Sequence, residues 1–326
     1  MTAAADIRDA TLLSGAVVLG GVLAPSLLLI GVPMASAGVA GLLGSGRFAA
    51  AAFAAAVAVA FAAFLSPADA VLLIPVLTAL LFVSLRLREH SALQGAAILT
   101  AVIAVSAAAA DAVRAWLAGS TLLQERTAMV ESALEMAGTV AGVDGDALAG
   151  LDSEILVDLM VRVWAVDYLT MGLLTAVLGV AVAGWASARV GTPVRRLPAL
   201  SELDLSPHIL WPFVGGLLLL AVGRMTGDTT GLAWIAGLNL LLAVRLPLFV
   251  QGLGVASALY RRVGLGRLAR VIGYALLAVV ELLVPVLSLV GLVDFWANFR
   301  KLPREDSRTS GGGDSESRSE NGQHES

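Results

Sequence analysis

Residues 231–301 decide the fold class of this chain: GLAWIAGLNLLLAVRLPLFVQGLGVASALYRRVGLGRLARVIGYALLAVVELLVPVLSLVGLVDFWANFRK. Two long apolar runs, at 231–260 and 271–293, flank a turn rich in arginine. Each run is long enough to cross the hydrocarbon core of a bilayer, which takes about 20 helical residues. The stretch therefore predicts two membrane-spanning helices, and one charge of each sign lies inside them, Arg245 and Glu281.

The composition of the whole chain is also typical of a membrane protein. Of its 326 residues, 58% are hydrophobic and 14% are charged, whereas a soluble domain carries roughly 25% charged residues. The absence of cysteine excludes disulfides and thiolate metal sites. The three histidines stand alone, so we expect no metal site and no cofactor. The net charge of −4 gives no support for nucleic-acid binding.

Further apolar runs predict six more spans, giving an all-α polytopic membrane helix bundle of about eight transmembrane helices. These runs cover residues 12–30, 48–65, 70–85, 92–117, 164–186 and 210–222. Residues 33–43 are too short for an ordinary span, and we expect a half-helix or a re-entrant segment there.

Residues 118–160 have a different character, with eight acidic residues and one basic residue, Arg126. Apolar residues at helical spacing predict one amphipathic helix in this insertion, and a second short helix is expected after Asp152. The insertion is interpreted either as a lid over a pocket or as a helical hairpin on the membrane surface. Residues 303–326 are polar and are expected to be disordered, which leaves 1–302 as a single integral membrane domain.

The arginines indicate an orientation, because loops on the cytoplasmic side carry an excess of basic residues. Arginine-bearing loops alternate along the chain with acidic or polar ones, which places 118–160 outside a bacterial cytoplasmic membrane. One conflict remains. A single crossing by 271–293 puts Arg300 and Lys301 outside, so either 231–260 is kinked or crosses twice, or another segment is miscounted.

Arg245 and Glu281 are the two charges that most need an explanation. An unpaired charge at a helix centre costs roughly 2.5–3.5 kcal/mol, so we expect the two to form an interhelical ion pair. The pair is interpreted as a packing clamp, or as a functional site where Arg245 binds an anion or Glu281 titrates. The third alternative is no contact. Tyr274, Glu281 and Ser288 are spaced by seven and predict one polar stripe on the last helix.

Two further polar patterns concern the same helices. Asn239, Arg245 and Gln251 are six apart, so they cannot line one face of a straight helix, and each is expected to meet a different neighbour. Trp296 and the basic residues beyond it are typical of interface anchors. Asp294 opposes the helix dipole at a C-terminus, so we expect an arginine to hold it. The candidate arginines are Arg270 and Arg300.

Several segments resemble a known family. They are RVG…RRLPAL…W-P at 189–212, GLNLLL around Asn239, LFVQGLGV around 251–253, and GLVDFWANFRK at 291–301. Together they resemble the YybS-like family of predicted bacterial membrane proteins (domain of unknown function 2232). The closing G-L-x-D-x-W-x-x-F-R-K pattern is the most specific part. The resemblance covers about 189–301, and the N-terminal half is compatible in layout only.

The resemblance implies a function class. That family is grouped with the substrate-binding S components of energy-coupling-factor transporters, which implies a small-molecule site and a partner transmembrane and ATPase module. The chain has no phosphate-binding loop or hydrolase motif of its own, so we expect no enzymatic activity. The expected function is S-component-like binding or uptake of a small solute. The alternatives are a non-transporting envelope scaffold, with envelope proteins as partners, and an ion or proton pathway through Glu281.

Overall fold

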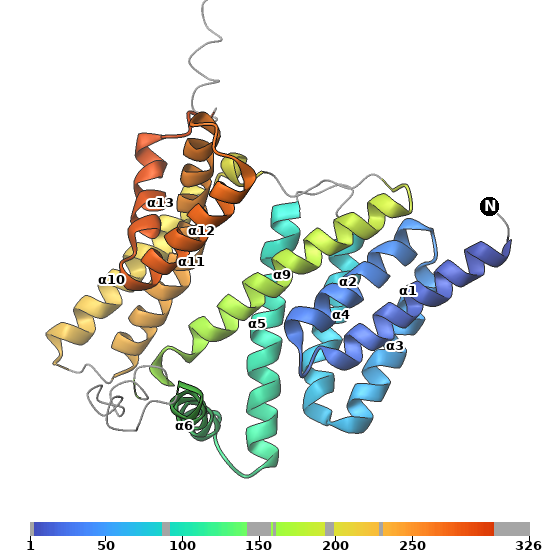
Figure 1. The fold of residues 1–326 in the computed structure, drawn as a ribbon. Coiled ribbons are helices and arrows are strands. Elements are labelled where there is room, and N and C mark those ends of the chain that lie inside the picture. The colour runs from blue at the N-terminus through green and yellow to red at the C-terminus, as the bar shows by residue number, and fades with distance from the viewer. Residues whose placement is uncertain are drawn as a thin grey trace, which may run out of the picture. The chain divides into compact units, whose positions relative to one another are not determined.

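The computed structural model describes residues 3–86, 92–141, 158, 161–192, 199–227 and 231–302. These residues form α-helices joined by short connections and two 3₁₀ turns, with no strand among them, which confirms the predicted all-α class (Figure 1). The predicted tail at 303–326 and the helix expected after Asp152 lie outside the described residues. The expectation of a single membrane domain over 1–302 stays a prediction.

The chain falls into two compact units. The first unit comprises Met1–Pro198 and Leu210–Val244, and the second comprises Ala199–Ile209 and Arg245–Ser326. The helices of the first unit are α1 (Ala3–Leu23), α2 (Leu28–Gly44), α3 (Phe48–Leu65), α4 (Pro67–Arg86), α5 (Ala92–Leu117), α6 (Leu122–Ala141), α9 (Trp164–Arg189), α10 (Leu210–Met225) and the first part of α11 (Leu232–Arg262). Those of the second unit are η1 (Leu200–Glu202), η2 (Pro207–Ile209), the rest of α11, α12 (Arg267–Leu283) and α13 (Val286–Ala297).

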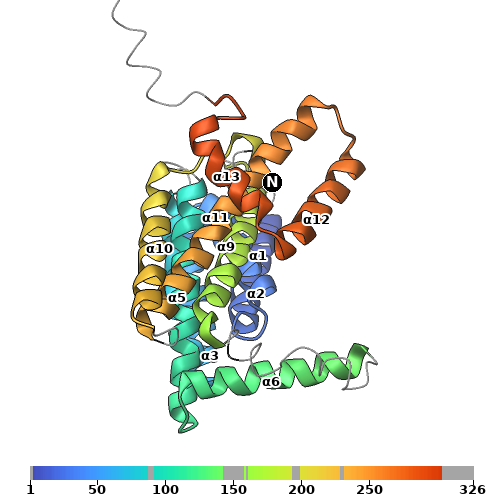
Figure 2. The same ribbon diagram turned by 90° about the vertical axis from the view of Figure 1, so that its left-hand side faces the viewer.

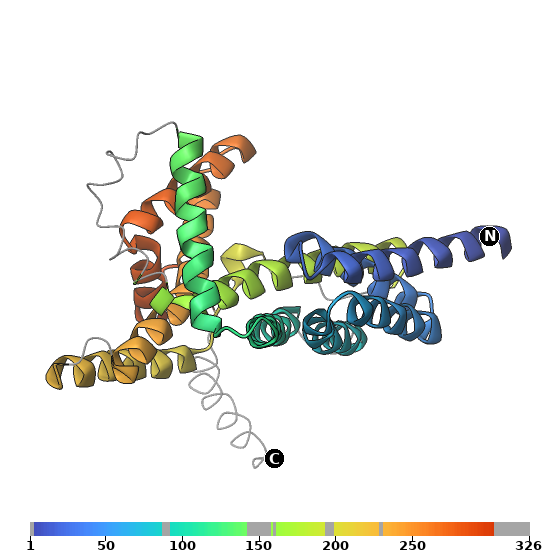
Figure 3. The same cartoon turned by 90° about the horizontal axis from the view of Figure 1, so that it is seen from below.

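The first unit is built in two layers, with α1, α2 and α9 packed on α3, α4 and α5 (Figure 3). Its interior is made largely of small side chains, which let helix backbones approach closely. A Cβ atom on Gly20 would lie 2.5 Å from the backbone N of Ala35, and one on Gly31 would lie 2.4 Å from that of Ala24. Large apolar side chains face outward instead, as expected where lipid is the solvent; they include Phe53, Phe64, Val105 and Trp116.

Residues 12–30, predicted as one span, are divided between two helices, so that prediction is wrong. α1 ends at Leu23 and α2 begins at Leu28. The break follows from Pro25, which has no N–H to continue α1 and disfavours a helical conformation in the residue before it. The half-helix expected at 33–43 is the second part of α2.

Six described helices are long and apolar enough to cross a membrane, or up to seven if a bent pair counts as one span. The six are Phe48–Leu65, Pro67–Arg86, Ala92–Leu117, Trp164–Arg189, Pro207–Met225 and Leu232–Arg262. Two shorter apolar helices, Asp9–Leu23 and Leu28–Gly44, add to these. A polytopic membrane bundle is therefore confirmed, with six to seven candidate spans among the described residues where about eight were predicted.

The predicted amphipathic helix of the acidic insertion is present as α6. Figure 2 shows α6 lying across the end of α5, and in Figure 3 α5 is seen nearly end-on while α6 runs across the view. This places α6 at the end of the first unit's bundle, and its location on a membrane surface stays a prediction.

Candidate functional site

Arg245 and Glu281 form the ion pair that their placement in the sequence predicts. Arg245 Nε donates to Glu281 Oε1 at 3.1 Å, and Arg245 Nη2 donates to the backbone carbonyl of Glu281. The Glu281 side chain is 7% exposed and that of Arg245 is 33% exposed. A carboxylate this deeply buried is tolerated because its charge is paired and hydrogen-bonded.

Glu281 also closes the N-terminus of α13. This helix begins at Val286, after Pro285, and no side chain of the preceding residue caps it. Glu281 Oε2 accepts hydrogen bonds from the backbone N of Leu287 at 2.8 Å and of Ser288 at 3.3 Å, and Ser288 Oγ donates to Glu281 Oε1. The first N–H groups of a helix lack partners and carry the positive end of its dipole, so a carboxylate there is favourable.

The predicted polar stripe of Tyr274, Glu281 and Ser288 on one helix is wrong. The chain breaks at Pro285, with α12 and α13 bent by 100°, because proline cannot continue α12. Glu281 and Ser288 still meet, but across the break. Tyr274 packs instead on Tyr260 of α11, with ring centroids 5.4 Å apart.

Two glycines allow α11 and α13 to pack backbone against backbone. A Cβ atom on Gly252 would lie 2.0 Å from the carbonyl oxygen of Leu287, and one on Gly291 would lie 2.1 Å from that of Leu248. Only glycine fits at such distances. Gly252 belongs to the Q-G-L segment and Gly291 to the closing pattern, so the two most specific motifs of the chain lie in contact.

A second buried charge pair lies at the other end of α13. Arg300 donates to Asp294 Oδ2 from Nε at 3.0 Å and from Nη2 at 2.7 Å, which confirms one of the two expected partners. The two side chains are 1% and 0% exposed. Asp294 Oδ1 accepts from the backbone N of Phe299 at 2.9 Å, and Gln251 Nε2 lies 3.4 Å from Oδ2. Arg270 bonds elsewhere.

Arg300 is therefore buried, and its expected role as an interface anchor is wrong. Asn298 adopts a left-handed conformation, with φ 42°, and turns the chain so that Arg300 folds back on Asp294. Arg300 Nη1 also donates to the carbonyl of Leu203. Gln251 Oε1 accepts from the backbone N of Leu205 at 3.0 Å. The same cluster thus ties residues 199–209 to α11 and α13.

The contacts of α13 resolve the conflict in the predicted orientation. They join α11 to α13 and the turn after it in ascending order along both: Arg245 with Ser288, Gln251 with Asp294, and Arg262 with Phe299. α13 therefore runs parallel to α11, because α12 first turns back along the chain and the break at Pro285 reverses the direction again (Figure 2). As in a re-entrant hairpin, Lys301 ends on the same side as Arg262, in agreement with the positive-inside rule.

Asn239 has separate partners in the first unit. Its Nδ2 donates to the carbonyls of Arg162 at 2.7 Å and Ile235 at 2.9 Å, while its buried Oδ1 has no partner among the described residues. Asn239, Arg245 and Gln251 thus each meet different neighbours, as their spacing predicts. Of the six candidates, Arg245 with Glu281 and Gln251 with Asp294 are brought together.

The first unit contains a cluster of charged side chains that the sequence did not predict. Arg126 of α6 stacks over the ring of Tyr168, 4.3 Å from its centroid, and its Nε donates to the hydroxyl at 3.2 Å. It lies 3.3 Å from Asp167 and 3.6 Å from Asp111. Arg126 therefore attaches α6 to the ends of α5 and α9.

The same cluster extends to α4. Arg114 pairs with Asp111 one turn away and with Asp69 at 3.0 Å. We call Asp69, Asp111, Arg114, Arg126, Asp167 and Tyr168 the end cluster. The available signals were the i,i+3 spacing of Asp111 and Arg114 and the single arginine of an acidic segment. Neither signal identifies partners as much as 57 residues away.

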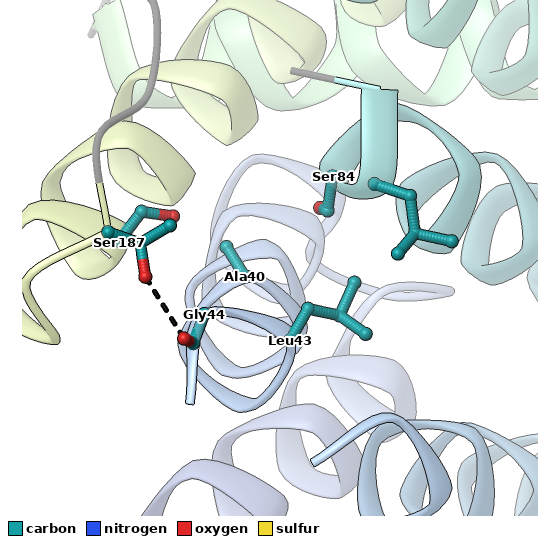
Figure 4. A pocket seen from close by; sticks show the side chains of 7 residues that line it. Ala40, Leu43, Gly44, Ser84 and Ser187 are labelled. Carbon is teal, nitrogen blue, oxygen red and sulfur yellow. Dashed lines mark hydrogen bonds between the residues drawn. The ribbon is translucent and has the colours of Figure 1, made fainter. Parts of the chain in front are cut away.

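A small hollow in the first unit lies apart from these charges (Figure 4). Its lining residues are Ala40, Leu43, Gly44, Ser84, Leu85, Ser187 and Thr192. Thr192 Oγ1 donates to the carbonyl of Gly44 at 3.0 Å. Neither the six candidate residues nor α6 line this hollow, so it gives no support to the interpretation of 118–160 as a lid.

Comparison with known proteins identifies the family. Residues 12–295 match the family described as predicted membrane protein (DUF2232), and the chain belongs to it. No curated protein and no solved structure matches the chain. Among the described residues there is no group of three or more acidic or histidine side chains that could hold a metal ion.

Proposed function

We propose that this member of the DUF2232 family is a non-enzymatic protein of the bacterial cytoplasmic membrane that binds a small solute, in the manner of an S component. The observation that carries the proposal is the break at Pro285, which places a helix N-terminus, Glu281 and Arg245 together within apolar helices. Broken helices and intramembrane charges are typical of solute and ion sites in transporters.

The hydrogen bonds of Arg245 support this choice. A guanidinium has five N–H donors, and those of Nε and one Nη2 serve Glu281. Nη1 makes no hydrogen bond to a described residue, and the side chain is 33% exposed. Arg245 can therefore donate hydrogen bonds to an anionic group of a solute while it keeps its contact with Glu281.

Native mass spectrometry of the purified full-length protein tests the proposal. We expect a small molecule to be retained by the native chain and by R224Q, a matched control at an exposed arginine of α10, and to be lost from R245Q. A co-purifying transmembrane and ATPase module would extend the likeness to an S component. Native protein that retains no small molecule under mild detergent would refute the proposal.

A scaffold without a ligand is the second candidate, because the carboxylate of Glu281 is already used within the chain. Its two oxygens accept from Arg245, Leu287 and Ser288. The double variant R245E/E281R distinguishes the two functions. For a clamp, the swap recovers part of the thermal stability that R245A and E281A lose, and nothing else changes. For a solute site, stability recovers while solute retention does not.

A further inference from the structure

The turn between α11 and α12 carries four arginines within ten residues. We call residues 261–270 the arginine turn; its arginines are Arg261, Arg262, Arg267 and Arg270. Gly264, with φ +74°, closes the end of α11, since a left-handed residue at this position favours glycine. α12 begins immediately afterwards at Arg267. The turn thus concentrates positive charge in one short segment that connects two apolar helices, α11 and α12.

Most of this charge is not neutralised by an acidic side chain among the described residues. Arg262 Nη2 donates to the carbonyl of Phe299 at 3.1 Å and Arg270 Nε to the carbonyl of Leu265 at 2.7 Å. A carbonyl fixes a guanidinium but carries no net charge. Arg267 is exposed and has no hydrogen bond or ion pair with a described residue.

Arg261 is the member with an acidic neighbour. Its Nη1 donates to Ser201 Oγ at 2.6 Å and lies 3.9 Å from a carboxylate oxygen of Glu202. Both charged side chains of that pair are more than half exposed, at 54% and 61%, so the pairing is weak. Lys301 lies at the same end of the second unit, two residues after the Phe299 that Arg262 contacts.

Exposed apolar side chains alternate with these arginines. Val263 and Leu268 are each 74% exposed. The apolar face of α12 continues from the turn; its exposed members are Leu268, Val271, Ile272, Leu276 and Val279. An acidic protein or nucleic acid would meet only the charges. A phospholipid leaflet matches both features, because phosphates meet the guanidinium groups while acyl chains cover the apolar face.

We propose that the arginine turn is a docking surface for the phosphate groups of anionic phospholipids. Arginine binds phosphate through two parallel N–H groups, and its remaining donors are free for this once a backbone carbonyl holds one of them. Charge complementarity selects anionic over zwitterionic lipid. This lipid-binding role is independent of solute binding at Arg245. The arginine turn lies at the C-terminal end of α11, whereas Arg245 lies near the middle of that helix.

Lipid retention on the full-length protein tests this surface. The protein is released from nanodiscs of equal phosphatidylglycerol and phosphatidylcholine, and retained lipids are counted by native mass spectrometry. The native chain is expected to be enriched in phosphatidylglycerol. In R262Q/R267Q the enrichment falls by up to roughly 30-fold at low salt, about 5-fold for each arginine. R189Q/R224Q removes two exposed arginines elsewhere and is expected to keep the enrichment.

Two further measurements separate lipid docking from misfolding and from a free-anion site. R262K/R267K keeps the charges and is expected to retain most of the enrichment, with the same melting temperature as R262Q/R267Q. Inorganic phosphate at millimolar concentration is expected to leave the enrichment in place. Equal enrichment in the native chain and R262Q/R267Q, an equal loss in R189Q/R224Q, or complete displacement by phosphate would each overturn the proposal.

Discussion

The end cluster of the first unit lies at the ends of apolar helices, whereas the Arg300–Asp294 pair of the second unit is buried among packed helices. In the end cluster, Arg114 is 41% exposed and pairs with carboxylates that water also reaches. In the second unit, Arg300 and Asp294 are 1% and 0% exposed. The two units therefore differ in how much desolvation of charge they must offset. Burying a charge is costly unless an opposite charge and hydrogen bonds satisfy it fully.

The two solutions use the backbone differently. The helices that meet at the end cluster begin or stop there, so their charges lie beside helix ends without interrupting a span. In the second unit the chain is broken at Pro285, and the freed N–H groups of Leu287 and Ser288 become partners of Glu281. A break inside an apolar region is stable only when such groups are satisfied. The carboxylate of Glu281 therefore stabilises the break at Pro285, and the N–H groups freed by the break stabilise the buried carboxylate.

The largest expected effect is the loss of the buried pair at the end of α13. In R300Q, Asp294 remains buried without its ionic partner, so the free energy of unfolding should fall by about 3–5 kcal/mol. Denaturant unfolding in detergent measures it. K301Q changes the next residue, which is exposed, and should stay within about 0.5 kcal/mol. Similar stabilities of the two variants would contradict the buried role of Arg300.

A smaller effect is expected from the close packing of α11 and α13. In G291A, the new Cβ atom would lie 2.1 Å from the carbonyl oxygen of Leu248, so α13 must shift, at a cost of about 1–3 kcal/mol. Gly184 of α9 has no atom within 4 Å of such a Cβ. G184A should therefore be neutral or stabilising by up to about 1 kcal/mol. Comparing the two melting temperatures checks this, and a stable G291A would mean that α11 and α13 are further apart.

The smallest effect is expected at the end cluster. R126Q removes ion pairs near the surface and a stacking contact with Tyr168, together about 1 kcal/mol. Because these pairs are partly exposed, the loss should shrink as salt rises. Limited proteolysis of α6 at two salt concentrations measures it. A loss of stability as large as that of R300Q, or one that does not change with salt concentration, would mean that the end cluster is buried in the native membrane.

Local patterns predicted the helices whose limits are set by composition alone. Residues 48–65 and 92–117 were predicted with the limits found for α3 and α5, because uniform apolar runs end at charged or polar residues. The errors lie at two prolines. Pro25 and Pro285 each interrupt a run whose hydrophobicity does not change, so a count of apolar residues passes over them.

The pairings of the buried charged side chains were also predictable only in part. The pair of Arg245 and Glu281 could be predicted because two opposite charges in apolar helices need each other. The capping of α13 by Glu281 could not, since it depends on the 100° bend. The position of Arg300 after the last span is typical of an anchor, and the sequence offered it only as one of two candidate partners of Asp294. The burial of Arg300 depends on the left-handed Asn298, whose effect on direction cannot be read from hydropathy.

Composition and spacing thus predict an all-helical, multi-span membrane protein with two opposite charges, Arg245 and Glu281, inside its last two apolar runs. The cost of burying charge and the length of apolar runs are local properties, which composition and spacing record. Three features are visible only in the folded chain: the last predicted helix is two helices, Gly252 contacts Gly291, and Glu281 binds both the N-terminus of α13 and Arg245. These features depend on chain direction after a break, which a few backbone dihedrals set.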